Sequence, residues 1–133
     1  VVIVPLSHRW DEKNKIKAKD LATEKVLLLD KTHCFSNQVT EACPGLSKNS
    51  EIQLGNSLEY IRSMVASNLG ISVLPKSATT AKYNNPLVKI ISFESPVPFR
   101  RVGLAYRKSA VKKSAIIKIV DVIKSLEFPK LHI

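Results

Sequence analysis

Two cysteines, Cys34 and Cys43, are the residues of this 133-residue sequence with the widest choice of chemistry. A thiol can pack as a small apolar group, ligate a metal ion, act as a nucleophile or form a reversible disulfide. A permanent disulfide is uncommon in the cytoplasm, where thiols are kept reduced. The residue types alone therefore leave four possibilities open: inert packing, metal binding, nucleophilic catalysis and redox switching.

The spacing of the two cysteines restricts how a disulfide could form. Cys43 follows Cys34 by nine residues. If one α-helix joined them, they would stand ~13 Å apart along its axis and about 180° apart around it. A disulfide needs Cα atoms within about 7 Å, so a helical segment cannot hold the bond. Pro44-Gly45 weakens the end of such a helix. A disulfide between the two cysteines would have to unwind this helix, and the pair could then act as a covalent conformational switch.

Metal binding is the next alternative, because His33 and the two cysteines could supply three ligands. The short Cys-x-x-Cys type of spacing found in structural zinc sites is absent, and adjacent His33 and Cys34 suit one tetrahedral ion poorly. We therefore expect no metal and no cofactor. A thiol enzyme remains open, since a base and an orienting group could come from elsewhere in the fold.

Short apolar runs alternate with helical patterns along the chain, which is typical of the α/β class. Because most of the runs are nearly continuous, we expect a mainly parallel sheet covered on both faces. The predicted strands are Val1–Val4, Val26–Leu29, Ile52–Leu54, Ile71–Leu74, Val88–Phe93 and Val102–Tyr106. The predicted helices are Lys17–Thr23, Cys34–Ala42, Ser57–Leu69, Ser77–Lys82 and Ala110–Leu126.

Two of these helices have features that bear on partners. Ser57 can cap the helix Ser57–Leu69, and Gly70 can end it in a left-handed turn. Its apolar stripe fits core packing more simply than a partner-binding face. The stripe consists of Leu58, Ile61, Val65 and Leu69. The last helix has a broad apolar side that needs a substantial cover, and Pro96-Val97-Pro98 is the best boundary before it.

The formal net charge of +10 suggests nucleic-acid binding, but the details argue against it. Lysines are scattered over almost every segment, and aromatic residues make up only 6%, so no stacking platform is evident. We expect a solvated lysine surface. No apolar run is long enough for a membrane span and no signal peptide is evident, which favours the cytoplasm. The chain starts inside an apolar run, and we expect it to belong to a longer protein.

The segment around the two cysteines closely resembles that of OxyR-type regulators, the hydrogen-peroxide sensors of the LysR family. It reads Thr32-His33-Cys34-Phe35-Ser36-Asn37-Gln38, followed by Cys43. The adjacent His-Cys pair and the nine-residue spacing are the specific part. Further matches are Ser7-His8-Arg9-Trp10, Asp20-Leu21-Ala22, Glu24 to Leu29, Asn56 to Ala66, Gly70-Ile71, Leu74-Pro75 and Val102 to Arg107. The likeness covers essentially the whole chain.

The resemblance implies a regulatory domain of two Rossmann-like subdomains, similar to type II periplasmic binding proteins. Residues 1–100 would form the second subdomain, which holds the cysteine pair. Residues 101–133 would be a crossover strand and a helix that return to the first subdomain. Most of the first subdomain and the amino-terminal DNA-binding domain would lie outside this chain.

The resemblance also implies a mechanism. Hydrogen peroxide would oxidise Cys34 to a sulfenic acid, which Cys43 would resolve into a disulfide, remodelling Cys34–Gly45. A helix start beside His33 would favour the thiolate form of Cys34. The surrounding donors would be His33, Thr32, Gln38 and Arg100, with Arg101 as the second choice for the arginine. The sequence departs from the family at Ser36-Asn37, where a charged pair is usual, and at Pro44, where an apolar residue is usual.

The partners that the resemblance implies are those of a transcription regulator rather than an enzyme. The chain would form a homodimer or tetramer, and its interface would consist of Leu58, Ile61, Arg62, Val65 and Ala66. DNA would be bound only through the absent domain, and RNA polymerase by the full-length protein. Glutaredoxin or thioredoxin would reset the disulfide, and no membrane is involved. The alternatives are a LysR-type domain for a small organic effector, with inert cysteines, and a thiol peroxidase or oxidoreductase.

Overall fold

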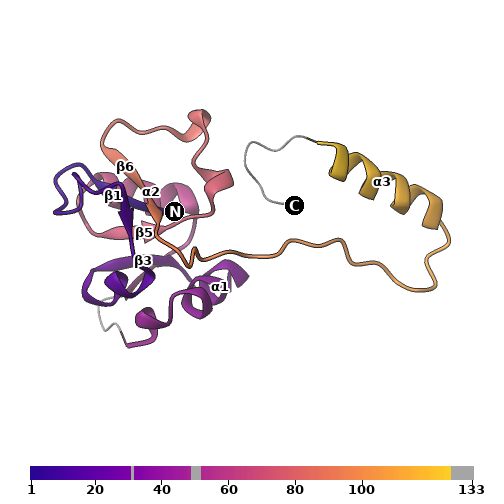
Figure 1. Ribbon diagram of the computed structural model, residues 1–133, viewed down its shortest axis with the longest axis horizontal. Helices are drawn as coiled ribbons and strands as arrows, with labels where there is room; N and C mark the ends of the chain where they lie inside the picture. Colours follow the sequence, from indigo (N-terminus) through magenta and orange to yellow (C-terminus); the bar gives the residue numbers. More distant parts are fainter. Residues whose placement is uncertain (31, 49–51, 127–133) are drawn as a thin grey trace. The chain divides into compact units, whose positions relative to one another are not determined.

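The computed structural model describes residues 1–30, 32–48 and 52–126. It divides into two compact units, Val1–Arg100 and Arg101–Ile133, which are described separately (Figure 1). The first unit contains the sheet and both cysteines. In its described part, residues 101–126, the second contains one helix.

A six-stranded sheet organises the first unit. Its strands are β1 (Val2–Pro5), β2 (Lys15–Ile16), β3 (Val26–Leu29), β4 (Ile52–Gly55), β5 (Ile71–Val73) and β6 (Val88–Phe93). They lie in the order β2-β6-β1-β5-β3-β4. β3 is parallel to β4 and β5, and β2 is parallel to β6, whereas β1 runs antiparallel to β5 and β6. The prediction of an α/β fold with a mainly parallel sheet is therefore confirmed.

Helices cover both faces of this sheet, as the continuous apolar strands predicted. Side chains of β3 alternate between two hydrophobic clusters, with Val26 and Leu28 on one face and Leu27 and Leu29 on the other. Helix α1 (Cys34–Ala42) and the 3-10 helices η1 (Ala18–Thr23) and η2 (Pro44–Lys48) cover the first face. Helix α2 (Leu58–Ala66) covers the second face (Figure 1).

The amino end of α2 confirms its predicted cap, because the Ser57 hydroxyl accepts a hydrogen bond from the Tyr60 amide at 3.1 Å. Its other end differs from the prediction. The helix stops at Ala66, and Asn68 adopts the left-handed conformation (φ 59°) that we assigned to Gly70. The Leu69 amide then bonds the Met64 carbonyl at 3.0 Å, which closes a Schellman motif.

Several other elements depart from the predictions. The short strand β2 was not anticipated, and the helix expected at Ser77–Lys82 is two 3-10 turns, η3 (Lys76–Ala78) and η4 (Ala81–Tyr83). The expected strand Val102–Tyr106 is wrong: the segment pairs with no strand among the described residues. An apolar run becomes a strand only where another strand can complete its hydrogen bonds.

Helix α3 (Lys113–Ser125) forms inside the predicted range of the last helix. None of its residues is buried. Ile117, Ile119, Val122 and Ile123 are each more than two fifths exposed. Its apolar side is therefore uncovered within the described part of the chain.

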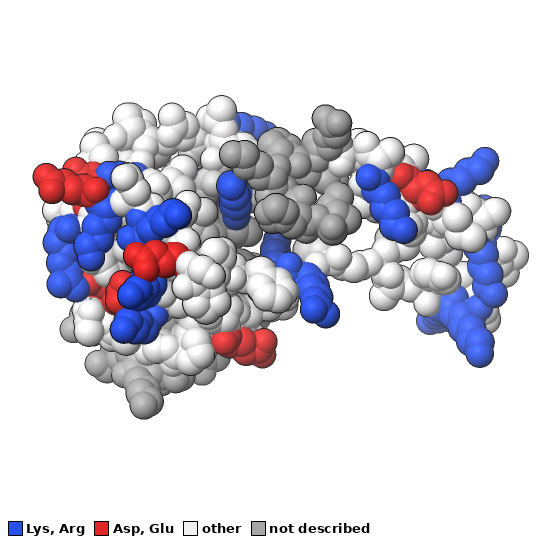
Figure 2. All heavy atoms as spheres, in the orientation of Figure 1, with Lys and Arg blue, Asp and Glu red and all other residues white. Residues whose placement is uncertain are grey.

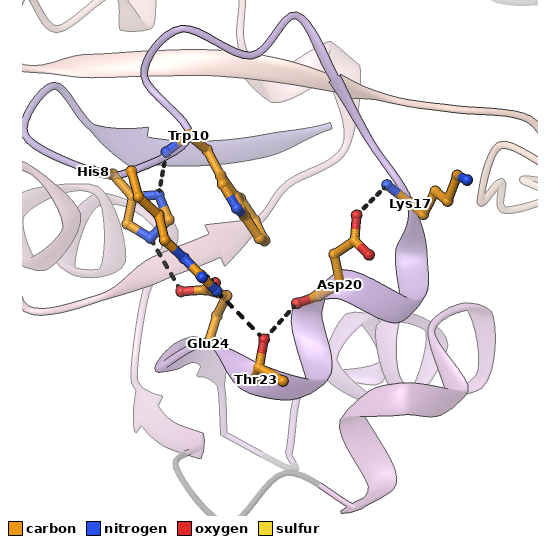
Figure 3. Close-up of polar contacts among 7 residues, drawn as sticks. His8, Trp10, Lys17, Asp20, Thr23 and Glu24 are labelled. Carbon is orange, nitrogen blue, oxygen red and sulfur yellow. Dashed lines mark hydrogen bonds and ion pairs between the residues drawn. The ribbon is translucent and has the colours of Figure 1, made fainter.

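A buried carboxylate holds the loop after β1 against the sheet (Figure 3). Glu24 is 8% exposed and accepts a hydrogen bond from the Arg9 guanidinium at 2.9 Å. The His8 Nε2 lies 3.2 Å from the other Glu24 oxygen, and His8 Nδ1 accepts the Trp10 amide at 3.2 Å. His8 thus donates through Nε2. These partners satisfy a charge that would be costly to bury alone, and Trp10 joins the core.

Gly70 marks a close approach between the starts of β3 and β5. A Cβ at this position would lie 2.6 Å from the Lys25 carbonyl oxygen, and its φ of +155° is one that other residues rarely adopt. Gly70→Ala should therefore lower the free energy of unfolding by about 2 kcal/mol or more, measured by urea denaturation. Gly103→Ala is the matched control, because a Cβ there meets no atom within 4 Å. Equal effects of the two substitutions would contradict the packing described.

Candidate functional site

Helix α1 carries the two cysteines at its opposite ends. Cys34 is its first residue, and Cys43 is its C-cap, whose amide bonds the Val39 carbonyl at 2.9 Å. Both thiols are free; Cys34 is exposed and Cys43 is buried. The predicted helix between them is confirmed. At the α-helical rise, nine residues separate the two positions by ~13 Å, beyond the reach of a disulfide.

The helix that separates the cysteines is held by few contacts. It has nine residues, and only Ser36 and Val39 are buried. His33 is its N-cap, but the His33 side chain makes no capping hydrogen bond. Short helices without strong caps depend on tertiary packing for their stability. Local unwinding of α1 is therefore cheap relative to unwinding an element of the core.

The turn before α1 is organised by Asp30, a residue that the sequence analysis missed. The Asp30 carboxylate accepts hydrogen bonds from both the amide (2.8 Å) and the hydroxyl of Thr32. These bonds hold the pKa of Asp30 below its usual value, and the bond from the Thr32 hydroxyl has the larger effect of the two. An Asp directly after a strand, two residues before a Thr, is a turn signal that could have identified it. The hydroxyl proton of Thr32 is thus directed to Asp30 rather than to the thiol.

Two further predicted residues lie on or beside helix α1, whose first residue is Cys34. Gln38 is about one turn along α1, and its side-chain Oε1 is buried without a hydrogen-bond partner among the described residues. Arg100 is far away in sequence, yet its guanidinium carbon lies 5.4 Å from the ring centre of Phe35, the neighbour of Cys34. The fold therefore brings Arg100 to the start of α1. Arg101 falls in the second unit.

Cys43 has a very different environment from Cys34. It is fully buried in the cluster that includes Val39 and Leu46. Burial raises the pKa of the Cys43 thiol, because an apolar environment disfavours the thiolate. Cys43 is therefore held as an unreactive thiol for as long as α1 and η2 keep it covered.

The structure divides the five residues assigned to a dimer interface. Ile61 and Val65 are 1% and 0% exposed and pack against the sheet, so in this conformation a partner cannot contact their side chains. Leu58, Arg62 and Ala66 are half-buried. The Arg62 guanidinium donates to the Ala78 carbonyl and lies 4.7 Å from the Tyr83 ring centre. Of the five predicted residues, the side chains of these three are the accessible ones.

Charges on one face of the first unit are mixed rather than segregated. On the face drawn in Figure 2, basic and acidic side chains of this unit lie among one another. Lys17 pairs with Glu94 at 3.8 Å and Lys89 with Asp11 at 3.9 Å. Mixed signs give no continuous track for a phosphate backbone on this face.

Within residues 1–30, 32–48 and 52–126, no group of three or more His, Cys, Asp or Glu side chains is placed to hold a metal ion. Over the same residues, every helix is too short or too polar to cross a membrane.

Comparison with known proteins gives one family and a consistent set of relatives. The model of the LysR substrate-binding domain matches residues 1–126. The hydrogen peroxide-inducible genes activator of Haemophilus influenzae is 32% identical over 118 residues, covering 87% of this chain and 39% of that protein. The chain thus spans about two fifths of that relative.

Solved structures give the same result. The reduced form of the OxyR regulatory domain from Pseudomonas aeruginosa is 40% identical with a TM-score of 0.79, covering 92% of this chain and 59% of that one. A reduced form of OxyR from N. meningitidis is 38% identical with a TM-score of 0.83, covering 93% and 60%.

The different environments of the two thiols should be visible in their reactivity. Under native, reducing conditions at neutral pH, Cys34 should react with iodoacetamide at least about tenfold faster than Cys43, because Cys43 must first be uncovered. Peptide mass spectrometry of a labelling time course measures both rates in one sample. Cys34→Ser and Cys43→Ser each leave a single thiol and serve as a matched pair of controls. Similar rates for both thiols would contradict the burial of Cys43.

Proposed function

The chain belongs to the family of LysR substrate-binding domains, and we propose that it is the peroxide-sensing part of an OxyR-type transcription activator. The matches reported above confirm the OxyR-type resemblance found in the sequence. The relatives are named as gene activators or regulators, which agrees with the expectation of a non-enzymatic protein. One observation carries the proposal: an exposed and a buried free thiol lie at opposite ends of one short helix.

The proposed reaction begins at the exposed thiol. The Cys34 thiolate attacks one oxygen of hydrogen peroxide, the O–O bond breaks, and the products are a sulfenic acid on Cys34 and hydroxide. Cys34 lies in the first turn of α1, at the positive end of the helix dipole. The reaction therefore starts at the thiol that peroxide can reach.

The residues around Cys34 would orient peroxide and stabilise the departing oxygen. Gln38 has a buried, unpartnered Oε1, which would accept a peroxide O–H once the side chain turns outward. His33 and the guanidinium of Arg100 are donors that could stabilise negative charge as the O–O bond breaks. The hydroxyl of Thr32 can act only as an acceptor while its proton is bonded to Asp30. Asp30 would then hold the turn in place.

The second step would couple disulfide formation to a change in the conformation of α1. The Cys43 sulfur attacks the sulfenic sulfur of Cys34, which forms the disulfide and releases water. Because ~13 Å of helix separates the two positions, α1 must unwind and Cys43 must leave the core first. The cluster around Val39 and Leu46 then loses a packed member. This rearrangement is the signal in the proposed mechanism.

The signal would be passed on by parts of the protein beyond this chain. We assign residues 1–100 to the second subdomain and residues 101–133 to the return to the first. A dimer or tetramer contact through Leu58, Arg62 and Ala66 on α2 would change when α1 unwinds. DNA and RNA polymerase would be reached by the full-length protein in the cytoplasm, and glutaredoxin or thioredoxin would reduce the disulfide.

Mass spectrometry tests the proposal directly. A few equivalents of hydrogen peroxide should remove two hydrogens from the full-length protein and link the Cys34 and Cys43 peptides. Cys34→Ser should abolish the change, whereas Cys43→Ser should stop at a sulfenic acid with one added oxygen. Hydrogen exchange of residues 35–42 should become faster on oxidation, because the helix must open.

Each alternative has its own outcome in this experiment. Thiols that stay free, together with an intact response to inducer in Cys34→Ser, would indicate a domain for a small organic effector. Turnover of many peroxide equivalents with a dithiol reductant would indicate a thiol peroxidase. A disulfide that forms with unchanged exchange in α1 would refute the switch.

A further inference from the structure

Phe35 occupies a unique position among the described residues. It is the second residue of α1, directly after Cys34. Its half-buried side chain packs against both hydrophobic clusters, and it is the one described residue assigned to the border of both. Phe35 is therefore connected to the thiol through the backbone and to both faces of the sheet through its ring.

The ring of Phe35 also contacts a charged side chain, that of Arg100. The guanidinium carbon of Arg100 lies 5.4 Å from the ring centre, which is cation–π distance. Arg100 follows β6 at the end of an irregular segment that contains Pro96 and Pro98. Among the described residues, this ring contact is the one interaction that fixes the Arg100 side chain. Without it, the arginine would have no defined place near α1.

The type of contact matters for the charge. A carboxylate partner would neutralise the guanidinium and occupy its N–H donors. An aromatic face attracts the cation electrostatically but leaves its charge and its in-plane donors available. A ring is thus a suitable support for an arginine whose charge must act on a third group. Phe35 places that charge beside the residue that carries the sensing sulfur.

We propose that Phe35 is a positioning residue that holds Arg100 beside Cys34 while α1 is helical and releases it when α1 unwinds. This inference rests on the proposed peroxide-sensing function. Because Phe35 is bonded to Cys34, the guanidinium follows the first turn of the helix. The disulfide form would lose this support, so the charge that assists oxidation is withdrawn once oxidation is complete.

Two thiol reagents of different charge test the contact without peroxide. The experiment uses the full-length protein with Cys43→Ser. The rate at which Cys34 reacts with the dianionic disulfide DTNB is divided by the rate at which it reacts with neutral iodoacetamide. A guanidinium held beside Cys34 raises this ratio. Phe35→Leu should lower it about two- to fivefold, the range expected for an exposed cation–π contact. Phe35→Tyr keeps an aromatic face and should retain the original ratio.

A double-variant cycle separates positioning from packing. Arg100→Gln should lower the ratio as Phe35→Leu does, and the double variant should show no further loss, since both changes remove one effect. Circular dichroism and thermal unfolding identify a variant that is merely misfolded. In that case Phe35→Tyr and Arg100→Gln decide the question. Additive losses, or an unchanged ratio in Arg100→Gln, would overturn the proposal.

Peroxide kinetics then connect the contact to sensing. The rate of Cys34 oxidation by hydrogen peroxide should fall about two- to fivefold in Phe35→Leu and stay unchanged in Phe35→Tyr. The two proposals fail in different ways. An unmodified protein that forms no disulfide with peroxide refutes the sensing function, even where the reagent ratio behaves as expected. A disulfide that forms at equal rates in all variants refutes the role of Phe35 alone.

Discussion

The α-helical rise is the constraint on which the functional interpretation depends. A backbone that advances about 1.5 Å per residue keeps Cys34 and Cys43 apart for as long as α1 exists. The sheet and its two hydrophobic clusters are formed chiefly by the strands, α2, η1 and η2, and α1 adds one buried residue, Val39, with Phe35 and Ala42 packed alongside. The protein thus combines a sheet that most of the core residues stabilise with one short helix that buries few of them. In the proposed mechanism, oxidation at that helix changes the conformation locally.

Burial assigns different roles to two residues of the same type. The exposed sulfur at the start of α1 meets solvent and the positive end of a helix, whereas the buried sulfur is kept protonated by its apolar surroundings. An oxidant therefore encounters the two thiols in a fixed order. Asp30 contributes by holding the turn before α1 through hydrogen bonds from Thr32 and from the His33 amide. The asymmetry is produced by packing and needs no additional catalytic group.

Much of the fold could be predicted because its signals are local. Continuous apolar runs identified β3 and β6 with their observed bounds, and the bounds of α1 were also predicted correctly. The short β2 contains one apolar residue, Ile16, and gave no periodic pattern. The run Val102–Tyr106 has strand-like composition, but composition cannot supply a partner strand.

The site was only partly predictable for the same reason. The cysteine spacing and the start of α1 are readable from adjacent residues. The contact between Phe35 and Arg100 joins positions 65 residues apart, and no local sequence pattern predicts it. Likewise, helical periodicity identified one apolar stripe on α2 but could not show that Ile61 and Val65 face the sheet rather than a second copy.

The uncovered apolar side of α3 has a practical consequence for anyone who handles this segment in isolation. Among the described residues, every buried hydrophobic side chain lies at or before Phe93, so none of them belongs to the second unit. The isoleucines and valines of α3 would instead be offered to any other apolar surface in a concentrated solution. Aggregation of the 133-residue chain would then originate in this helix, and truncation after Arg100 would remove its source while keeping both cysteines and the sheet.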